Sequence, residues 1–447
     1  MGGSHGSFWS YESLSMTTTK PISIFLIIFM MCATAARAWA TWSDFRGPWG
    51  NGLATAVDEK PRGLPLHWSE TENVRWKTAI PHRGWSTPVV ADGQIWLTTA
   101  TADGQDYFVI CVDAGSGAIR LNERLFHSDD PEPLGNDMNG YASPTPVLEA
   151  GRVYVHFGSY GTACLDATTH KVLWQRTDLP CRHFRGPGSS PILFADLLIL
   201  TMDGVDVQYL VALNKVTGRT VWRTDRTADW NDLGADGKPV SEGDLRKAYS
   251  TPLVVDVNGT KQMLSVGAKA LYAYDPASGR ELWKVNHRAY SGAARPVYGK
   301  GIAYMITGFG KTDLFAIDVS GRGDITDSHV LWKTSSGMPR TPSPVLVGDL
   351  LFTVSDTGTA TCLDAATGAR IWREFVRGHH AASPLYADGR IYYFDQQGKT
   401  TVLKASREYE ALATNTLDGG FMASPAVSGK ALLLRTKTHL YRIESDQ

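Results

Sequence analysis

The sequence lacks any sizeable net charge, because its 44 Lys and Arg residues are matched by 45 Asp and Glu residues. Nucleic-acid-binding domains are usually basic, so this balance argues against a nucleic-acid partner. The sequence also has no P-loop, no G-x-G-x-x-G, and no H-E-x-x-H or C-x-x-C metal signature, and residues 41–447 contain no G-x-S-x-G. The enzyme classes that such motifs identify are therefore not indicated, and no residue is assigned as catalytic.

Cysteine is scarce, with 5 residues in 447. Cys111, Cys164 and Cys362 occupy the same position in different repeats, in the contexts CVD, CLD and CLD. Equivalent positions in separate repeats do not bring two sulfur atoms within bonding distance. We therefore expect buried, unpaired thiols at these three positions.

Long hydrophobic runs are also rare, and the clearest one lies near the N-terminus. Residues 22–33 are apolar and follow Lys20, but the run of about 12 residues is shorter than the roughly 20 that cross a bilayer. A-x-A patterns end at Ala38 and Ala40, and either is a suitable cleavage site. We interpret this region as a secretory signal peptide, with Met16 as an alternative start and an uncut N-terminal anchor as the alternative interpretation. The mature chain is then expected in the periplasm or cell envelope, without a transmembrane segment.

Glycine and tryptophan are abundant, at 44 and 14 residues, and both follow a repeat. One repeated element is Asp-x-x-x-Gly-x-x-x-Trp, clearest from Asp364 through Gly368 to Trp372. The other is a Pro preceded by small or hydroxylated residues, which opens a strand. The repeated prolines are Pro88, Pro144, Pro191, Pro252, Pro296, Pro344, Pro384 and Pro425.

Each repeat predicts four short strands joined by tight turns. Asp388-Gly389 is a typical hairpin turn between two apolar strands, and Gln397-Gly398 is the next. The Asp-x-x-x-Gly turn leads into the outermost strand, where Gly takes a positive φ without steric cost. The Trp that follows is expected to wedge between neighbouring units, burying on the order of 200 Å².

The two ends of the chain complement each other. The last unit, from Pro425 to Ile443, has only three strands, and residues 73–77 with Trp76 supply a fourth. Joining them closes the ring and leaves no open sheet edge. We predict an all-β, eight-bladed β-propeller with four-stranded blades; an open β-solenoid is the alternative. The predicted divisions are a signal peptide over 1–40, an N-terminal arm over 41–72 and the propeller over 73–447.

The repeat resembles that of a known family. LDAATGARIW, with YDPASGRELW and LDATTHKVLW, is similar to the tryptophan-docking repeat of pyrroloquinoline-quinone (PQQ) quinoproteins, and the resemblance covers essentially all of residues 70–447. Similar repeats occur in BamB, the outer-membrane assembly lipoprotein, for which the resemblance implies a scaffold without a quinone. FRGPWGNG and LPCRHFRGPGSS look like segments of exported PQQ-like repeat proteins. Quinoprotein dehydrogenases resemble longer chains with adjacent cysteines that stack on the quinone, and this sequence has none.

In a propeller, the segment before each repeated Pro dips toward the central channel. Three of these segments are enlarged: Leu121–Pro144, Trp174–Pro191 and Trp222–Pro252. Long insertions on one side of one face are usually functional. We expect them to wall one sector of the channel mouth, the alternative being tolerated surface insertions.

In the few residues that precede each repeated Pro, Lys and Arg outnumber Asp and Glu, although the whole chain is balanced. Arginine guanidinium groups suit carboxylate, phosphate or sulfate, so the mouth is predicted to bind a small anionic ligand. The alternative is solvated rim charge without a ligand. The candidate ligand-binding residues are Arg83, Asn139, His183, Arg185, Arg295, Arg340, His379 and Asp418.

Three functions remain open. The first is an exported, non-enzymatic binding or scaffold module, with an envelope protein or a small anion as partner and with neither cofactor nor metal. The second is a PQQ-dependent dehydrogenase acting on alcohols or sugars with calcium, in which Asp137 or Asp418 serves as base. The third is a hydrolase or lyase that acts on anionic sugars.

Overall fold

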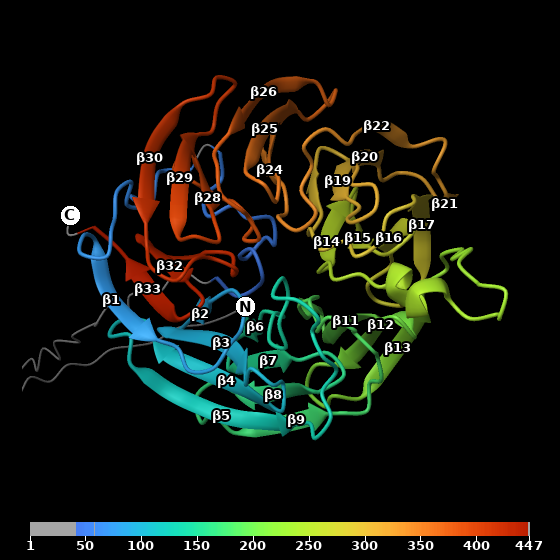
Figure 1. Ribbon diagram of the computed structural model, residues 1–447, viewed down its shortest axis with the longest axis horizontal. Helices are drawn as coiled ribbons and strands as arrows, with labels where there is room; N and C mark the ends of the chain where they lie inside the picture. Colours follow the sequence, from blue (N-terminus) through green and yellow to red (C-terminus); the bar gives the residue numbers. More distant parts are fainter. Residues whose placement is uncertain (1–41, 58, 446–447) are drawn as a thin grey trace, which may run out of the picture. The chain divides into compact units, whose positions relative to one another are not determined.

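The computed structural model describes residues 42–57 and 59–445, and the predicted signal peptide lies outside the described residues. These described residues belong to one compact unit. Its described strands form eight sheets that follow one another around a ring, as Figure 1 shows. The predicted all-β, eight-bladed propeller is confirmed. The helical structure in the described residues is one short 3-10 helix, η1 (Val240–Arg246).

Each blade is an antiparallel meander with its first strand nearest the channel (Figure 1). Blade 1 comprises β2 (Val89–Ala91), β3 (Gln94–Ala100), β4 (Asp106–Asp113) and β5 (Ile119–His127). Blade 2 comprises β6 (Val147–Glu149), β7 (Arg152–His156), β8 (Thr162–Asp166) and β9 (Val172–Arg176). Blade 3 comprises β10 (Ile192–Phe194), β11 (Leu197–Asp203), β12 (Gln208–Asn214) and β13 (Thr220–Asp225). Blade 4 comprises β14 (Leu253–Val257), β15 (Thr260–Val266), β16 (Ala270–Tyr274) and β17 (Glu281–Asn286).

The second half of the ring follows the same plan. Blade 5 comprises β18 (Val297–Gly299), β19 (Ile302–Ile306), β20 (Leu314–Asp318) and β22 (Val330–Thr334). Blade 6 comprises β23 (Val345–Val347), β24 (Leu350–Val354), β25 (Thr359–Asp364) and β26 (Arg370–Phe375). Blade 7 comprises β27 (Leu385–Ala387), β28 (Arg390–Phe394), β29 (Lys399–Lys404) and β30 (Ala411–Thr416). Blade 8 comprises β31 (Ala426–Ser428), β32 (Ala431–Arg435), β33 (His439–Ile443) and the N-terminal β1 (Val74–Ala79).

Ring closure occurs where it was predicted. Strand β1 pairs antiparallel with β33, with Lys77 opposite Tyr441 and Thr78 opposite Leu440. Glu70 strengthens the junction, since its carboxylate accepts hydrogen bonds from Lys77 Nζ (2.7 Å) and from the Tyr441 hydroxyl (2.9 Å). The two ends of the chain therefore share one sheet.

The repeated tryptophans dock between blades, as expected. Gly117 has a φ of +76°, and a Cβ there would lie 2.6 Å from the Trp76 ring of the preceding blade. Trp76 Nε1 also donates a hydrogen bond to the Ala114 carbonyl (3.2 Å). The turn thus needs Gly both for its backbone angle and for the close approach of the indole. Equivalent pairs are Trp174 with Gly218, Trp222 with Gly279, and Trp332 with Gly368.

Blade 4 departs from the four-stranded plan. The insertion between Asp318 and Trp332 forms β21 (Gly323–Asp324), which pairs in parallel with β17 and adds a fifth strand. Trp283 lies on β17, is fully buried and donates a hydrogen bond to Gln262 Oε1 of its own blade (2.9 Å). The insertion therefore covers a tryptophan that elsewhere in the ring docks on a neighbouring turn.

The repeated Ser/Thr-Pro element has a structural reason. The hydroxyl before the Pro accepts a hydrogen bond from the backbone N–H of the equivalent residue in the preceding blade, which links neighbouring inner strands around the channel. The bonds run from Thr87 to Thr145 (3.0 Å), Thr145 to Ser190 (2.9 Å), Ser190 to Thr251 (2.9 Å), Arg295 to Ser343 (2.9 Å), Ser343 to Ser383 (3.0 Å) and Ser383 to Ser424 (3.0 Å).

We call this set of hydroxyl groups, which link neighbouring inner strands, the hydroxyl ring. Two of its details correct the predictions made from the sequence. Strand β6 begins directly after Pro146, so Pro146 rather than Pro144 is the repeated proline of blade 2. In blade 5 the equivalent position is Arg295, which has no hydroxyl, and its side chain is used differently, as described below.

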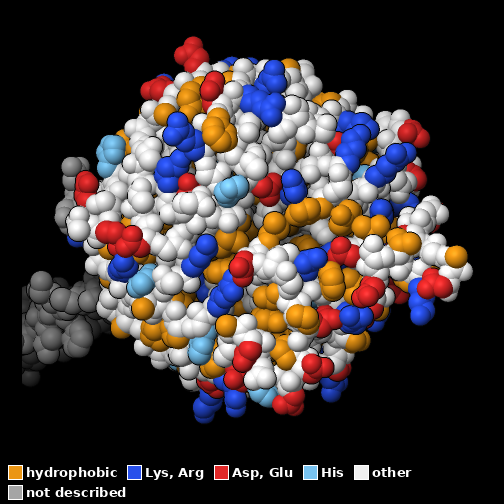
Figure 2. Space-filling view, in the orientation of Figure 1, with side chains coloured by type: hydrophobic (Ala, Val, Ile, Leu, Met, Phe, Trp, Pro, Cys, Tyr) orange, Lys and Arg blue, Asp and Glu red, His pale blue; other side chains and the backbone are white. Residues whose placement is uncertain are grey.

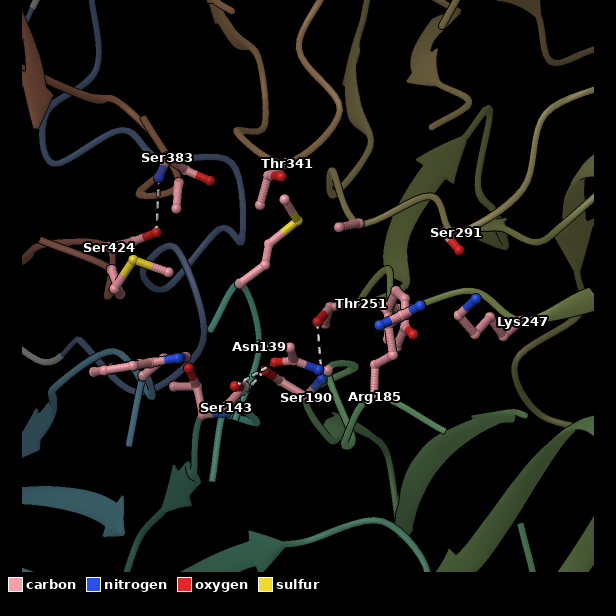
Figure 3. A pocket seen from close by; sticks show the side chains of 18 of the residues that line it. Asn139, Ser143, Arg185, Ser190, Lys247, Thr251, Ser291, Thr341, Ser383 and Ser424 are labelled. Atoms are coloured by element: carbon pink, nitrogen blue, oxygen red, sulfur yellow. Dashed lines mark hydrogen bonds between the residues drawn. The ribbon is translucent and has the colours of Figure 1, made fainter. Parts of the chain in front are cut away.

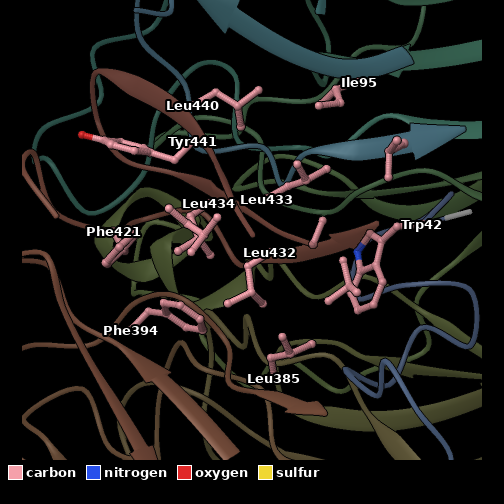
Figure 4. Close-up of a cluster of buried hydrophobic side chains, with 14 of the residues drawn as sticks. Trp42, Ile95, Leu385, Phe394, Phe421, Leu432, Leu433, Leu434, Leu440 and Tyr441 are labelled. Carbon is pink, nitrogen blue, oxygen red and sulfur yellow. The ribbon is translucent and has the colours of Figure 1, made fainter. Parts of the chain in front are cut away.

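The N-terminal arm is anchored in the hydrophobic core. Trp42 forms a β-bridge with Val90 of blade 1 and belongs to a buried cluster with residues of blades 1, 7 and 8, including Ile95, Leu385 and Leu432 (Figure 4). Further along the arm, Leu53 forms a bridge with Tyr386 of blade 7. The arm is therefore an integral part of the ring.

The hydroxyl ring yields a stability prediction. Replacing Ser343 by Ala removes the acceptor of the buried Arg295 amide, and an unsatisfied buried donor costs about 1–3 kcal/mol. We expect Ser343→Ala to lower the free energy of unfolding by that amount in urea denaturation. Ser335→Ala, at an exposed residue, is the control and should change it by less than about 0.5 kcal/mol. Equal stabilities for the two variants would contradict the structural role of the ring.

Candidate functional site

A cavity of about 350 Å³ opens at one end of the central channel, where the segments before the inner strands converge. Figure 2 shows a hollow near the centre of this face, with hydrophobic and basic side chains around it. The three enlarged segments supply about half of the residues that line the cavity. This agrees with the expectation that they wall one sector of the channel mouth. From them come Asn136, Met138, Asn139, Ser143, Arg185, Gly188, Ser190, Asp244, Lys247, Tyr249 and Thr251.

Two cations line the cavity. Arg185 lies between β9 and β10, and its guanidinium stacks on the Phe184 ring, 4.9 Å from the ring centre. No side chain or carbonyl among the described residues accepts a hydrogen bond from that guanidinium. Since a guanidinium has five donors, Arg185 is free to bind an anion that enters the cavity.

Lys247 follows η1 and is 2% exposed. Its Nζ contacts the Asp244 carboxylate and donates to the Asp244 carbonyl (2.9 Å). Burial, followed by the charge of Arg185, lowers the pKa of Lys247 to about 8. Lys247 thus adds positive charge beside Arg185 while remaining held by its own segment.

Hydroxyl groups form a second set of donors in the cavity. Thr145, Ser190, Thr251 and Ser424 each use an oxygen lone pair to accept an amide hydrogen bond from the preceding blade. The O–H of such a group remains available as a donor. Figure 3 shows Ser190, Thr251 and Ser424 among the labelled residues that line the pocket.

The remaining surface of the cavity is largely aromatic. Trp85, Tyr249, Tyr290 and Phe309 form its walls, and Phe45 of the N-terminal arm also lines it. Aromatic faces favour planar apolar groups. The combination suits a ligand with an apolar, planar part and an anionic group.

Asn139 lines the cavity but both ends of its amide are engaged. Its Nδ2 donates to the carbonyls of Gly186 (3.0 Å) and Pro187 (3.2 Å), and its Oδ1 accepts from Ser143 Oγ (2.5 Å; Figure 3). Asn139 therefore joins two of the enlarged segments and positions the loop that carries Arg185.

Two predicted candidates are buried beside the cavity without lining it. His183 is 6% exposed, lies 3.7 Å from Cys181 Sγ through Nδ1, and has a pKa lowered by burial to about 4, so it is neutral. Arg295 is 2% exposed and bonds to the Phe45 carbonyl and to Asp44 Oδ2 (3.1 Å). Arg295 thus anchors the N-terminal arm instead of facing the mouth.

The other candidates lie at the rim or beyond it. Arg83 forms an ion pair with Asp137 (2.8 Å) beside an adjoining pocket. Arg340 is exposed and stacks on Phe309 (5.0 Å), and His379 is also exposed. Asp418 is 77% exposed and lies 3.8 Å from Lys77 on the strand that closes the ring, not among the residues that line the cavity.

The described residues offer few groups suited to metal binding or to thiol chemistry. In the described part of the chain, no three His, Cys, Asp or Glu side chains are grouped as metal ligands would be. Cys111, Cys164 and Cys362 are free and buried, as predicted, and so is Cys181. Burial raises the pKa of each of these thiols, so none is an activated nucleophile.

Sequence reasoning missed the hydroxyl and aromatic lining. The hydroxyls were visible in the repeated Ser/Thr-Pro element, which we used only to count blades. The aromatic residues had no repeat signal, because Trp85, Tyr249 and Tyr290 occur in loops of different length. Lys247 precedes the repeated Pro of blade 4, but nothing in its sequence context distinguishes it from the other basic residues near the repeated prolines.

The comparisons with known proteins agree with this fold. The family model described as outer membrane protein assembly factor BamB matches residues 52–177 and 318–409. BamB from Moraxella catarrhalis has a TM-score of 0.56 and 13% identity, over 83% of this chain and 99% of that chain. A europium-containing methanol dehydrogenase has a TM-score of 0.64 and 12% identity, over 90% and 88%. The quinohemoprotein alcohol dehydrogenase from Comamonas testosteroni has a TM-score of 0.65 and 12% identity, over 91% and 81%.

These likenesses show a PQQ-like repeat propeller similar to BamB and to quinoprotein dehydrogenases. At 12–13% identity they concern the fold alone. No curated protein matches the sequence. None of the helical structure in residues 42–57 and 59–445 has the length and apolar character that a bilayer-spanning segment requires.

The buried histidines predict a pH dependence of stability. Burial lowers the pKa of His183 to about 4, and of His156 and His287 to about 3, from 6.5. Between about pH 4 and 6.5 the unfolded chain therefore binds more protons, so stability falls as the pH is lowered through this window. We expect His183→Asn to show a shallower loss between pH 6.5 and 4.5 in urea denaturation. An unchanged slope would mean that His183 is not buried neutral.

Proposed function

We propose that the protein is a non-enzymatic binding module of the cell envelope whose channel mouth holds a small organic anion. Arg185 carries the proposal, because its guanidinium lines an aromatic cavity and has no acceptor among the described residues. Lys247 adds positive charge, and the hydroxyls of the inner strands supply further donors. An anion with a planar apolar part would satisfy all three features of the lining.

The envelope location rests on two observations. The N-terminal sequence has the run of apolar residues and the A-x-A sites of a secretory signal. The family model that matches the chain is described as an outer membrane protein assembly factor. A protein partner in the envelope is compatible with this function, since the blades surround the cavity and leave the outer surface of the ring available for contact.

The alternative function is a PQQ-dependent dehydrogenase. The cations and aromatic walls of the cavity suit the carboxylates and planar rings of that quinone. The calcium that would accompany it fits less well, because Asp244 is the only carboxylate among the described residues that line the cavity, and it contacts Lys247. Asp418, proposed from the sequence as a base, is outside the cavity lining. The donor set therefore favours binding over metal-assisted oxidation.

Calorimetric titration with aromatic carboxylates tests the proposal. Phthalate, benzoate and PQQ would be titrated into the protein, with benzamide as an uncharged comparison. We expect one-to-one binding of at least one carboxylate and a Kd that rises about 10–100-fold in Arg185→Met, the loss expected for a charged hydrogen bond. Arg340→Met is the matched control, since Arg340 lies outside the cavity lining, and its Kd should stay within about twofold.

Two results would contradict the proposal. One is the absence of binding by every carboxylate, and the other is binding that Arg185→Met leaves unchanged. Turnover of alcohols or sugars by the protein with PQQ and calcium, followed by dye reduction, would replace the binding function with the dehydrogenase.

A further inference from the structure

The N-terminal arm crosses the channel on the inner side of the cavity. Its Ser43 carbonyl accepts a hydrogen bond from the Leu148 amide of blade 2 (2.8 Å), and Asp44 pairs with Arg295 of blade 5. Further on, the Ala54 amide donates to the Tyr386 carbonyl of blade 7 (2.8 Å). Since Phe45 lines the cavity and its neighbours reach three distant blades, the arm forms the floor of the cavity and closes the channel beneath it.

Arg46, the residue after Phe45, is 1% exposed, and Nε, Nη1 and Nη2 are all buried without a hydrogen-bond partner in the described structure. The other buried arginines are all satisfied. Arg226 pairs with Asp203, Arg295 with Asp44 and Arg442 with Glu444, and Arg435 donates to Ser86 and to the Thr98 carbonyl.

An unpaired buried guanidinium is energetically unfavourable. A charge that leaves water without a counter-charge or acceptors costs several kcal/mol. A guanidinium cannot avoid this cost by losing its proton at physiological pH. Arg46 also takes a positive φ of 64°, which is unfavourable for a residue with a side chain. The burial of Arg46 therefore needs a compensating group.

No residue that the structure describes supplies this group as a hydrogen-bond acceptor for the Arg46 guanidinium. Asp44 is the nearest acid in sequence, but its Oδ2 is bonded to Arg295, and its Oδ1 is buried without a hydrogen-bond partner and makes no bond to Arg46 in the described structure. Burial, followed by repulsion from the Arg295 charge, lowers the pKa of Arg46 to about 9, so a second cation lies nearby. Gly52 packs against the guanidinium so closely that a Cβ there would overlap it. Arg46 is thus buried near a second cation, with Gly52 of the arm packed against its guanidinium.

We propose that Arg46 holds one small inorganic anion, chloride being the most abundant, enclosed in the channel beneath the cavity floor. The anion would accept the guanidinium hydrogens and neutralise the charge that Arg46 and Arg295 leave in excess of Asp44. It would also fix the turn that carries Phe45, and hence the floor of the cavity. This site is separate from the Arg185 cavity and does not depend on the proposed function.

Bromide provides a direct probe of the site. Crystals of the full chain grown in sodium bromide should show an anomalous bromide peak within about 3.5 Å of the Arg46 guanidinium nitrogens. In solution, bromide added to protein in halide-free buffer should raise the Tm by about 2 °C, and the rise should saturate as a binding site fills.

Variants separate site binding from a general salt effect. Arg46→Met removes the charge at similar length and should abolish the saturable rise. Arg435→Met is the matched control, because it removes another buried arginine that already has acceptors, and it should keep the rise. Water alone at Arg46 in the bromide crystals, or the same Tm response in wild type and Arg46→Met, would overturn the proposal. The crystal measurement needs only the wild-type chain, so a variant that fails to fold does not weaken the test.

Discussion

Pairing between β1 and β33 is the interaction on which the whole molecule depends. A propeller blade buries its faces only against two neighbours, so an incomplete eighth blade would expose both a sheet edge and the core of blades 1 and 7. The register that places Thr78 opposite Leu440 completes the blade. Strand β1 is then held in the ring, and the N-terminal arm that precedes it is brought to the channel. The arm lies across the channel, and the cavity opens on one side of it.

Within the closed ring, the charged side chains at the channel come from positions that depart from the repeat. Seven inner strands carry a hydroxyl before the repeated Pro, but blade 5 carries Arg295, which reaches the arm. Two of the three long segments add Arg185 and Lys247 to one sector of the mouth. The common elements hold the blades together, and the exceptions provide charge at the cavity and beneath its floor.

The sequence predicted the ring because its signals are local and repeated. A Gly needed for positive φ and a Trp that docks on it recur at four of the eight junctions between blades, and the repeated Pro recurs in every blade, so the number of blades and the closure by residues 73–77 followed from spacing. The site was predicted only in part. A position before the repeated Pro indicates proximity to the axis, but not whether a side chain faces the cavity, as Arg185 does, or is covered by the arm, as Arg295 is. Asp418 lies near Lys77 of the strand that closes the ring, and not among the residues that line the cavity.

Native mass spectrometry of the protein isolated from cells that make it naturally tests the central claim most directly. If the closed ring forms a cavity for a small organic anion, the protein should carry a stoichiometric ligand whose mass matches a carboxylate, phosphate or sulfate compound small enough for a cavity of about 350 Å³. The same ligand should be absent from protein with Arg185→Met. A mass equal to the bare chain in every preparation, or a ligand that the Arg185 variant retains, would contradict the account.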